Sequence, residues 1–292
     1  MRVFLTGGSG FVGSAVIREL VAAGHHVTGL ARSDEAARKL EAAGVGVHRG
    51  ELTDPASLHA GAAASDGVIH CAFSHDDSAD RAGNCLKDRT AIEAIGTALA
   101  GSDRPFVLTS GTGRLPSGAP ITELDLPPLD GDERGRSEHL ALAFAERGVR
   151  VSCVRLPPSV HGEGDHGFVP MLIDLARKTG RSGYIGDGSN RWPAVHRLDA
   201  ALAFRLALEQ APVRTVLNAV GEEGIPTRAI AEAIGARLGL PVESVAADHF
   251  SWLGRFFALD LPVSSQRTRE RFAWTPAGVG LLADLENGTY FR

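Results

Sequence analysis

The sequence is poor in cysteine and tyrosine. Its 292 residues include three cysteines and two tyrosines. The cysteines, Cys71, Cys85 and Cys153, are odd in number and far apart, so their spacing favours neither a disulfide framework nor a zinc site. This usage is typical of a reducing compartment, and we expect a cytoplasmic protein.

Long apolar runs and basic clusters are absent too. No stretch approaches the roughly 18–20 consecutive apolar residues that cross a bilayer, and the opening run MRVFLTGG is too short for a signal peptide. We therefore expect no membrane association. The formal net charge is −5, from 30 basic and 35 acidic residues, and no basic patch stands out, so we expect no nucleic-acid partner.

The first half of the chain alternates short apolar runs with helical patterns. Such alternation predicts βαβ units and a parallel sheet, which is an α/β fold. Strands are expected at 2–6, 26–31, 45–50, 67–73, 105–110 and 149–156, and helices at 13–24, 33–44, 55–64, 84–101 and 129–148.

After Pro157 the alternating pattern ends, and a loop rich in glycine, proline and histidine follows. Further helices are expected at 168–180, 197–210 and 226–239, with a strand at 215–220. We predict a Rossmann-type doubly wound sheet with a smaller, discontinuous substrate lobe at the carboxyl edge of its strands, where open sheets bind ligands. The expected division gives 1–156 and 192–220 to the Rossmann core, and 157–191 and 221–292 to the lobe.

The stretch TGGSGFVG (6–13) follows the first strand and opens the first helix. Gly7, Gly10 and Gly13 have the spacing that lets a backbone turn tightly and approach a pyrophosphate resting on the helix N-terminus. A purely structural turn is the alternative. The strand–turn–helix context favours nucleotide binding.

The end of the second strand bears on the choice of cofactor. An acidic residue there would bind the ribose hydroxyls and favour NAD, but this sequence has Ala31, Arg32 and Ser33. Arg32 can pair with a 2′-phosphate through charge-assisted hydrogen bonds, with Ser33 as an auxiliary donor. An exposed arginine without a ligand is the alternative, and we expect NADP(H) in preference to NAD(H).

With these features and four later segments, the chain resembles the short-chain dehydrogenase/reductase superfamily, in its extended or atypical branch (NAD-dependent epimerase/dehydratase-like). The segments are similar to the family's in order, over about residues 1–220, and the remainder matches loosely. They read GELTD (50–54), DGVIHCAF (66–73), VRLPPSVHGEG (154–164) and WPAVHRLDAALAFRLAL (192–208).

The resemblance implies where a dinucleotide binds. Glu51 with Leu52 would meet the adenine, Ala72 and Phe73 would lie beside the adenosine, and the backbone at Ser159 and Val160 would lie near the nicotinamide amide. The fingerprint contributes Thr6, Gly7, Gly10, Phe11, Val12 and Gly13.

Family chemistry normally uses a Ser or Thr with a Tyr and a Lys in the motif Y-G-x-S-K. This sequence has Arg134-Gly135-Arg136-Ser137-Glu138 there. Arginine cannot act as a general acid near neutral pH, which excludes the usual tyrosine mechanism. Either Arg134 and Glu138, at i and i+4, form a surface ion pair, or Glu138 holds ribose while Arg134 polarises a substrate oxygen.

Other groups are candidates for proton transfer. Ser110 or Thr112 is the candidate for the family's hydroxyl, unless the segment is a plain turn. His161 stands in the place of the family's V-Y-G tyrosine, and a histidine suits acid–base work at neutral pH. His75 and Tyr184 are further candidates. The alternative for His161, His75 and Tyr184 is that each only lines the cleft as a polar side chain.

Two loops bear on metal and substrate. The run HGEGDHG lacks a recognised metal spacing, and we expect no metal. The aromatic residues among the last fifty residues of the chain either line an apolar pocket or pack in the core. If they line a pocket, they favour an apolar carbonyl or alcohol as the small-molecule substrate. They are Phe250, Trp252, Phe256 and Phe257.

Three functions remain open. The first is an NADP(H)-dependent oxidoreductase without the usual Tyr/Lys pair, acting on a small hydrophobic carbonyl or alcohol. The second is a non-catalytic NADP(H)-binding sensor or regulatory protein, and the third is an isomerase or dehydratase with tightly held cofactor. The resemblance also implies a homodimer through the helices at 84–101 and 129–148.

Overall fold

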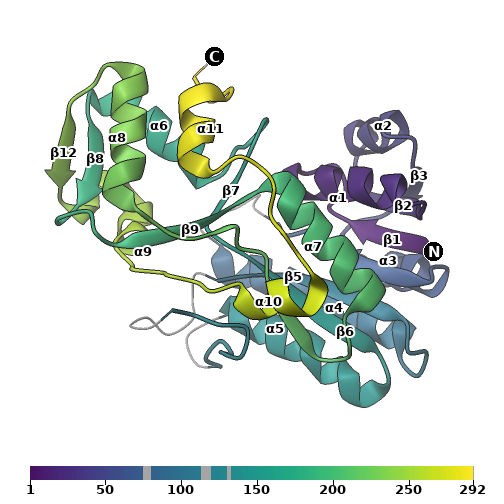
Figure 1. Cartoon of the computed structure of the whole chain (residues 1–292). Coiled ribbons are helices and arrows are strands. Elements are labelled where there is room, and N and C mark those ends of the chain that lie inside the picture. The colour runs from purple at the N-terminus through teal and green to yellow at the C-terminus, as the bar shows by residue number, and fades with distance from the viewer. Residues whose placement is uncertain (75–79, 113–119, 130–132, 292) are drawn as a thin grey trace. The chain divides into compact units, whose positions relative to one another are not determined.

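The computed structural model describes residues 1–74, 80–112, 120–129 and 133–291 (Figure 1). The chain divides into two compact units. Unit 1 comprises Met1–Ser110, Leu126–Arg155 and Ala201–Leu217, and unit 2 comprises Gly111–Asp125, Leu156–Ala200 and Asn218–Arg292. The predicted division into core and lobe stays a prediction. In the described part of the chain, no helix is long and apolar enough to cross a membrane.

Unit 1 contains a seven-stranded sheet in the order β10-β6-β5-β4-β1-β2-β3. Strand β1 pairs in parallel with β2 and β4. This confirms the predicted doubly wound fold. The elements wholly or mainly in unit 1 are β1 Arg2–Thr6, α1 Phe11–Ala22, β2 His26–Ala31, α2 Asp34–Ala42, β3 Gly46–Arg49, α3 Pro55–Ala63, β4 Gly67–His70, α4 Arg81–Leu99, β5 Pro105–Gly111, α5 Glu133–Ala143, the 3₁₀ turn η1 Phe144–Arg147, β6 Arg150–Leu156, α7 Arg197–Gln210 and β10 Thr215–Asn218.

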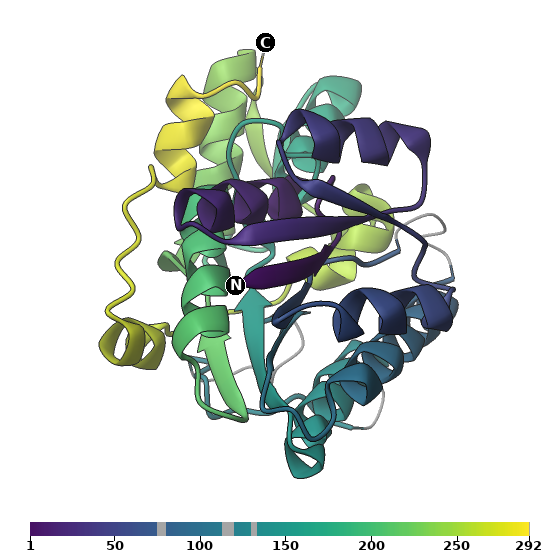
Figure 2. The ribbon, with the colours of Figure 1, turned by 90° about the vertical axis from the view of Figure 1, so that its right-hand side faces the viewer.

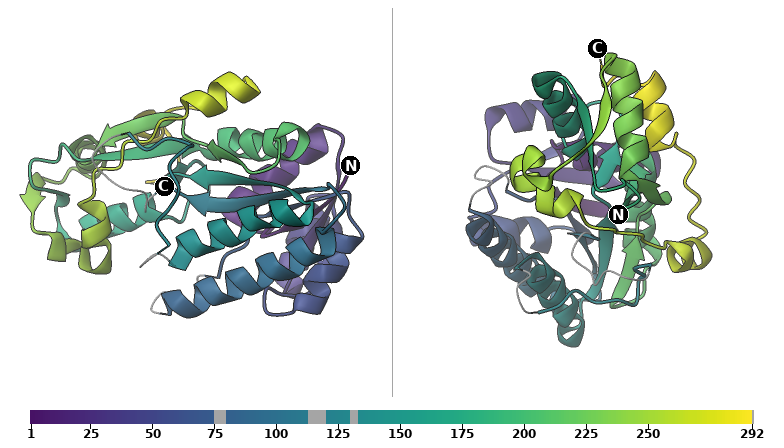
Figure 3. Two further views of the ribbon diagram at one scale, coloured as in Figure 1. Left: turned by 90° about the horizontal axis from the view of Figure 1, so that it is seen from below. Right: turned by 90° about the vertical axis from the view of Figure 1, so that its left-hand side faces the viewer.

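Helices cover both faces of this sheet. Helices α3, α4 and α5 lie together on one face, and α1 and α2 lie on the other (Figures 2 and 3). Strands β1, β4, β5 and β6 are buried along most of their length, as expected of parallel strands under two helical layers, whereas β2 and the edge strand β3 have exposed positions. Phe4 of β1 and Phe106 of β5, each at most 1% exposed, belong to the core under α3–α5.

Local signals set the element ends. Ser33 caps α2 by accepting a hydrogen bond from the amide of Ala36 at 3.2 Å, and two acidic residues follow in the first turn, as the helix dipole favours. Helix α5 is shorter than the expected 129–148, because the chain tightens into η1 and then turns at Gly148 with φ of 71°.

Unit 2 holds a three-stranded sheet, β11-β9-β7, and a two-stranded sheet, β12-β8. Helix α8 packs on β8, and α11 packs on α8. The sequence analysis missed all five strands, which are three to six residues long. The elements are β7 Ser159–His161, α6 Phe168–Thr179, β8 Ser182–Ile185, β9 Arg191–His196, β11 Glu222–Pro226, α8 Thr227–Leu238, β12 Val242–Val245, the 3₁₀ turn η2 Ala247–Leu253, α9 Gly254–Phe257, α10 Gln266–Phe272 and α11 Leu281–Asn287.

The aromatic cluster of the last fifty residues belongs mainly to the core of unit 2. Phe250 and Phe257 are 5% and 1% exposed, with ring centroids 4.7 Å apart, and Phe257 packs edge-on against buried Trp192. Phe256 is partly buried on the same core, whereas Trp252 is 63% exposed. Core packing therefore explains most of this cluster.

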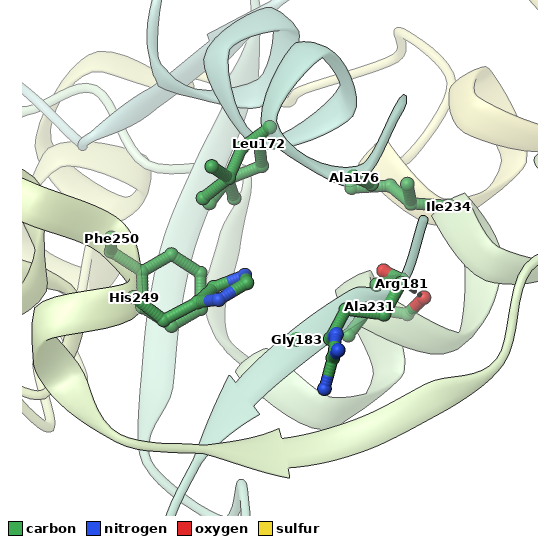
Figure 4. Close-up of a pocket in the computed structure, with 10 residues that line it drawn as sticks. Leu172, Ala176, Arg181, Gly183, Ala231, Ile234, His249 and Phe250 are labelled. Atoms are coloured by element: carbon green, nitrogen blue, oxygen red, sulfur yellow. Dashed lines mark hydrogen bonds between the residues drawn. The ribbon is translucent and has the colours of Figure 1, made fainter. Parts of the chain in front are cut away.

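A small cavity lies beside this core, between α6, α8 and η2 (Figure 4). Leu172, Ala176, Ile234 and Phe250 line it, with a volume of about 10 Å³. A volume of about 10–15 Å³ is the minimum for one water molecule. The cavity is thus too small for a substrate.

Candidate functional site

The turn between β1 and α1 has no room for side chains at two glycines. Gly7 has φ of 76°, and a Cβ there would lie 2.6 Å from the backbone nitrogen of Ala72. A Cβ on Gly13 would overlap the carbonyl oxygen of Gly7. The close packing of helix and strand therefore requires glycine at both positions.

This turn suits a pyrophosphate. In the described chain, α1 has no side-chain cap at Gly10 and no acidic residue in its first turn, so its N-terminal dipole faces no competing negative charge of its own. Phe11 and Val12 are half-buried in that first turn. The residues present fit the phosphates of a dinucleotide.

At the end of β2, Ala31 is buried and Arg32 and Ser33 are exposed. The nearby carboxylate of Asp34 is paired with Arg49 at 2.7 Å. That ion pair offsets the acidic charge next to Arg32. Of the other residues predicted to contact the adenosine, Glu51 is exposed, and Leu52, Ala72 and Phe73 are half-buried.

A buried polar chain links β1, β4, α4 and α5 in unit 1. Thr6 Oγ1 lies 2.7 Å from His70 Nδ1, and His70 Nε2 lies 3.3 Å from Asp88 Oδ1. The other Asp88 oxygen pairs with Arg134 Nη1 at 2.8 Å. Thr6, His70 and Asp88 are at most 1% exposed.

The hydrogen-bond directions in this chain follow from its members. A carboxylate only accepts, so His70 Nε2 carries the proton toward Asp88. In the neutral imidazole, Nδ1 then accepts from the Thr6 hydroxyl, while the Ala72 amide donates to Thr6 Oγ1 at 3.2 Å. The chain thereby fixes the segment after β4 against β1, beside the glycine turn.

The charge of Asp88 is maintained by its partners. Burial opposes ionisation of Asp88, but the positive charge of Arg134 and the hydrogen bond from His70 outweigh it and lower its pKa to about 2. Arg134 also donates to the Thr109 carbonyl oxygen at 3.1 Å and lies over the Phe73 ring at 4.1 Å. Arg134 is therefore anchored inside unit 1 on three elements.

Glu138 forms a second buried ion pair. Arg155 Nε lies 3.1 Å from each Glu138 carboxylate oxygen, and Arg155 Nη2 also donates to Oε1. The two side chains are 0% and 1% exposed. The alternative of a surface ion pair between Arg134 and Glu138 is therefore wrong, because each has a buried partner elsewhere. The predicted ribose contact of Glu138 would have to replace the pair with Arg155.

The hydroxyl candidates lie at and just after the end of β5. Ser110 is 7% exposed and Thr112 is fully buried. Among the described residues, Thr112 Oγ1 has no hydrogen-bond partner. Nearby, burial raises the pKa of the Cys71 thiol to about 12, which excludes Cys71 as a thiolate nucleophile.

In unit 2, His161 is fully buried at the end of β7, and the preceding residue, Val160, is half-buried. Its Nδ1 lies 2.8 Å from Asp284 Oδ2 of α11, and its ring meets that of His196 edge-on, with centroids 5.4 Å apart. Within the described residues, His161 Nε2 and Ser159 Oγ are buried without a hydrogen-bond partner.

The structure describes only one of the other two proton-transfer candidates. Tyr184 lies on β8 with the Arg228 guanidinium 5.5 Å from its ring centroid. His75 lies outside the described residues. Both remain predictions.

Sequence reasoning missed four site residues: His70, Asp88, Arg155 and Asp284. Three of them interrupt apolar segments, His70 in GVIHCAF, Arg155 in VRVSCVRL and Asp284 in LLADLE, whereas Asp88 stands between Lys87 and Arg89. A charged residue on the buried face of a strand or helix needs a partner. That signal was available, but it does not name the partner.

Comparisons with known proteins agree with this geometry. Residues 3–219 match the family model described as "NAD dependent epimerase/dehydratase family". An uncharacterized protein of Schizosaccharomyces pombe is 48% identical over 299 residues, covering 100% of both chains. The 2-alkyl-3-oxoalkanoate reductase of Stenotrophomonas maltophilia is 31% identical over 270 residues, covering 82% of this chain and 77% of that protein.

The fold is shared with solved structures. The UDP-glucose 4-epimerase of Thermotoga maritima, with UDP-glucose, aligns with a TM-score of 0.79 at 18% identity, covering 100% of this chain and 98% of that one. The family match spans most of the chain and contains the glycine turn. The chain belongs to the NAD-dependent epimerase/dehydratase family, whose members are NAD(P)-dependent oxidoreductases and epimerases.

Proposed function

We propose that this protein is an NADP(H)-dependent oxidoreductase acting on a small hydrophobic carbonyl or alcohol. The observation that carries the proposal is the glycine turn, in which Gly7 and Gly13 leave space only for backbone next to the N-terminus of α1. A turn of this shape binds the phosphates of a dinucleotide. We further propose a cytoplasmic location and a homodimer through α4 and α5.

Preference for the phosphorylated cofactor rests on the end of β2. Arg32 and Ser33 are exposed where an acidic residue would select NAD, and Arg49 neutralises Asp34 next to them. A 2′-phosphate would add charge-assisted hydrogen bonds to Arg32. NADH lacks that phosphate and would lose those bonds.

A carbonyl substrate is supported by the relatives. The Stenotrophomonas maltophilia protein is a 2-alkyl-3-oxoalkanoate reductase, and a 3-oxoalkanoate carries a keto group and a carboxylate on an alkyl chain. We transfer from it only the class of reaction, the reduction of a carbonyl on an alkyl chain. The aromatic cluster gives this choice less support than expected, since Phe250 and Phe257 pack in the core.

The bound cofactor supplies or accepts the hydride. Half-buried Arg134 and buried Glu138 then serve as anchors for α5: the first contacts Phe73 and the end of β5, and the second pairs with Arg155. Neither supplies a proton. We assign proton transfer to His161, whose second ring nitrogen remains available for a hydrogen bond.

The cofactor assignment is tested by calorimetry on the wild type and on Arg32→Ala. We expect the substitution to weaken NADPH binding by about 1–3 kcal/mol, the range for charged hydrogen bonds, and to leave NADH binding nearly unchanged. Equal losses for both cofactors would refute the phosphate contact. Arg38→Ala, on α2, serves as a control for general loss of positive charge.

The reaction is tested with a panel of apolar aldehydes and ketones, followed by loss of NADPH absorbance. Turnover that depends on His161 supports the oxidoreductase. Tight NADPH binding without turnover on any substrate contradicts it and favours a second candidate, a cofactor-dependent sensor. That candidate is motivated by the ion pairs that hold Arg134 and Glu138.

An isomerase or dehydratase is a third candidate. It is motivated by the fold shared with the Thermotoga maritima epimerase. Cofactor that copurifies with the protein and is not consumed during turnover would favour it. Stoichiometric NADPH consumption excludes it.

A further inference from the structure

One face of β7 carries two buried polar atoms that lack partners. Ser159 and His161 are two residues apart on this strand, so their side chains point to the same side. Among the described residues, Ser159 Oγ and His161 Nε2 make no hydrogen bond. Burying a polar group without a hydrogen-bond partner is unfavourable, which points to a ligand or water as the missing partner.

The opposite nitrogen of His161 is held by α11. Asp284 Oδ2 lies 2.8 Å from Nδ1, and α11 packs against β7 and β9. Leu281 and Leu285, on either side of Asp284 in the helix, are at most 1% exposed, so the helix is anchored by apolar packing. Asp284 therefore faces His161 from a fixed position.

This contact selects one tautomer of the neutral imidazole. A carboxylate only accepts hydrogen bonds, so Nδ1 carries the hydrogen and Nε2 keeps its lone pair. The paired residue on β9, His196, is kept from competing for the proton, because burial and the neighbouring His161 lower its pKa. Asp165 is engaged with Tyr290, whose hydroxyl donates to Oδ2 at 2.6 Å.

We propose that Asp284 is a positioning residue that aims His161 Nε2 at the substrate oxygen, with Ser159 Oγ as a second hydrogen-bonding group on the same face. The inference rests on the proposed function and extends it to α11, beyond the residues 3–219 that match the family model. It gives the C-terminal segment of the chain a part in the reaction.

In carbonyl reduction, bound NADPH would supply a hydride to the carbonyl carbon. The C=O π pair would move to oxygen, and that oxygen would take the Nε2 proton of protonated His161. The products are the alcohol, NADP⁺ and neutral His161, which regains a proton from solvent. Asp284 stays ionised and stabilises the protonated ring while it exists.

The first test reads the tautomer and needs no activity. Long-range ¹H–¹⁵N spectra of protein labelled at histidine, assigned with His161→Asn, should show neutral His161 with hydrogen on Nδ1. Asp284→Ala should move the hydrogen to Nε2, and Asp284→Glu should restore Nδ1–H in part. Hydrogen on Nε2 in the wild type overturns the positioning role, and this reading does not depend on whether a variant folds.

The second test uses kinetics on the same proteins. We expect His161→Asn to lower kcat by about 100-fold or more, the range for losing a general acid, with KM changed less than kcat. Asp284→Ala should lower kcat by on the order of tenfold, and the exposed Asp187→Ala of unit 2 should leave it unchanged. Wild-type kcat in both His161→Asn and Asp284→Ala overturns the inference.

Failure of the proposed function and failure of this inference give different results. A wild type that reduces no carbonyl overturns the proposed function and the proton transfer together, whatever the spectra show. Turnover in the wild type that survives loss of His161 overturns this inference alone. In that case the oxidoreductase stands and another group moves the proton.

Discussion

Two buried carboxylates, one in each unit, have different surroundings. Glu138 of unit 1 has both oxygens within hydrogen-bond distance of Arg155, which is also buried. Asp284 of unit 2 holds one nitrogen of His161, and the other nitrogen of that ring has no partner in the described chain. The first arrangement is complete without a ligand, whereas the second leaves a polar atom that a ligand would satisfy.

This difference distinguishes residues that maintain structure from residues that act on a ligand, at positions where the sequence departs from the family motif. Arg134 and Glu138 stand where the resemblance places the reactive tyrosine and lysine, and both are engaged in ion pairs that fasten α5. Residues in satisfied pairs maintain structure, and their loss should reduce stability. Residues next to an unsatisfied atom should affect turnover more than stability.

The largest stability effect is expected for Glu138→Gln. The change leaves Arg155 charged, fully buried and without its counter-ion, which typically costs about 3–5 kcal/mol. Urea unfolding measures the loss. The exposed pair of Glu35 and Lys39 is the control, since Glu35→Gln should leave the free energy of unfolding nearly unchanged. A loss as small as the control's would contradict the structural role.

Asp88→Asn should cost on the order of 2 kcal/mol at pH 7, from the pKa lowered to about 2 in the folded state. Because the folded pKa is depressed, the contribution of Asp88 is fully present above its unfolded value near 3.9 and is lost as the pH falls toward 2. The gap between wild type and variant should therefore close over that window. A gap that is constant from pH 7 to pH 2 would show that the charge is irrelevant.

Thr6→Val removes the hydroxyl that joins β1 to His70 and Ala72. Buried His70 Nδ1 would be left without a hydrogen bond and the half-buried Ala72 amide would lose its acceptor, so we expect a loss of about 1–3 kcal/mol by thermal or urea unfolding. Thr28→Val, at an exposed position of β2, is the matched control and should stay within about 0.5 kcal/mol. Equal effects at the two positions would argue against the buried chain.

The smallest stability effect is expected for Ser159→Ala. Its hydroxyl has no partner in the described chain, so its removal should change stability by less than about 0.5 kcal/mol or stabilise slightly. Ser182→Ala is the contrast, because Ser182 Oγ donates to the Ala231 carbonyl at 2.8 Å and its loss should cost about 1 kcal/mol. A larger loss of stability for Ser159→Ala than for Ser182→Ala would contradict the absence of a hydrogen-bond partner for the Ser159 hydroxyl.

Much of unit 1 was predictable from the sequence. Its strands are continuous apolar runs that alternate with helical patterns, and glycine follows several of its helices, so the alternation predicted the fold. The cofactor contacts inferred from the glycine turn stay predictions. The strands of unit 2 were not found, because runs as short as Ser159–His161 have no measurable alternation. They form through pairing with distant segments, as β7 does with β9.

The site was only partly predictable for a related reason. Arg134, Glu138 and His161 were recognised as unusual from their positions in motifs. Their partners Asp88, Arg155 and Asp284 come from other elements, up to 123 residues away in the case of His161 and Asp284. Sequence spacing does not encode such pairs, so of the two alternatives for Arg134 and Glu138 the i, i+4 surface pair was wrong, and the sequence did not indicate the partners that each residue has.

The most direct test of the proposed oxidoreductase follows the hydride itself. Wild-type protein is given NADPH deuterated at the transferable C4 position together with apolar aldehydes and ketones, and the alcohols are analysed by mass spectrometry. We predict one deuterium on the carbinol carbon of the product and one NADP⁺ formed per alcohol. Tight NADPH binding with no deuterated alcohol from any carbonyl would contradict the account.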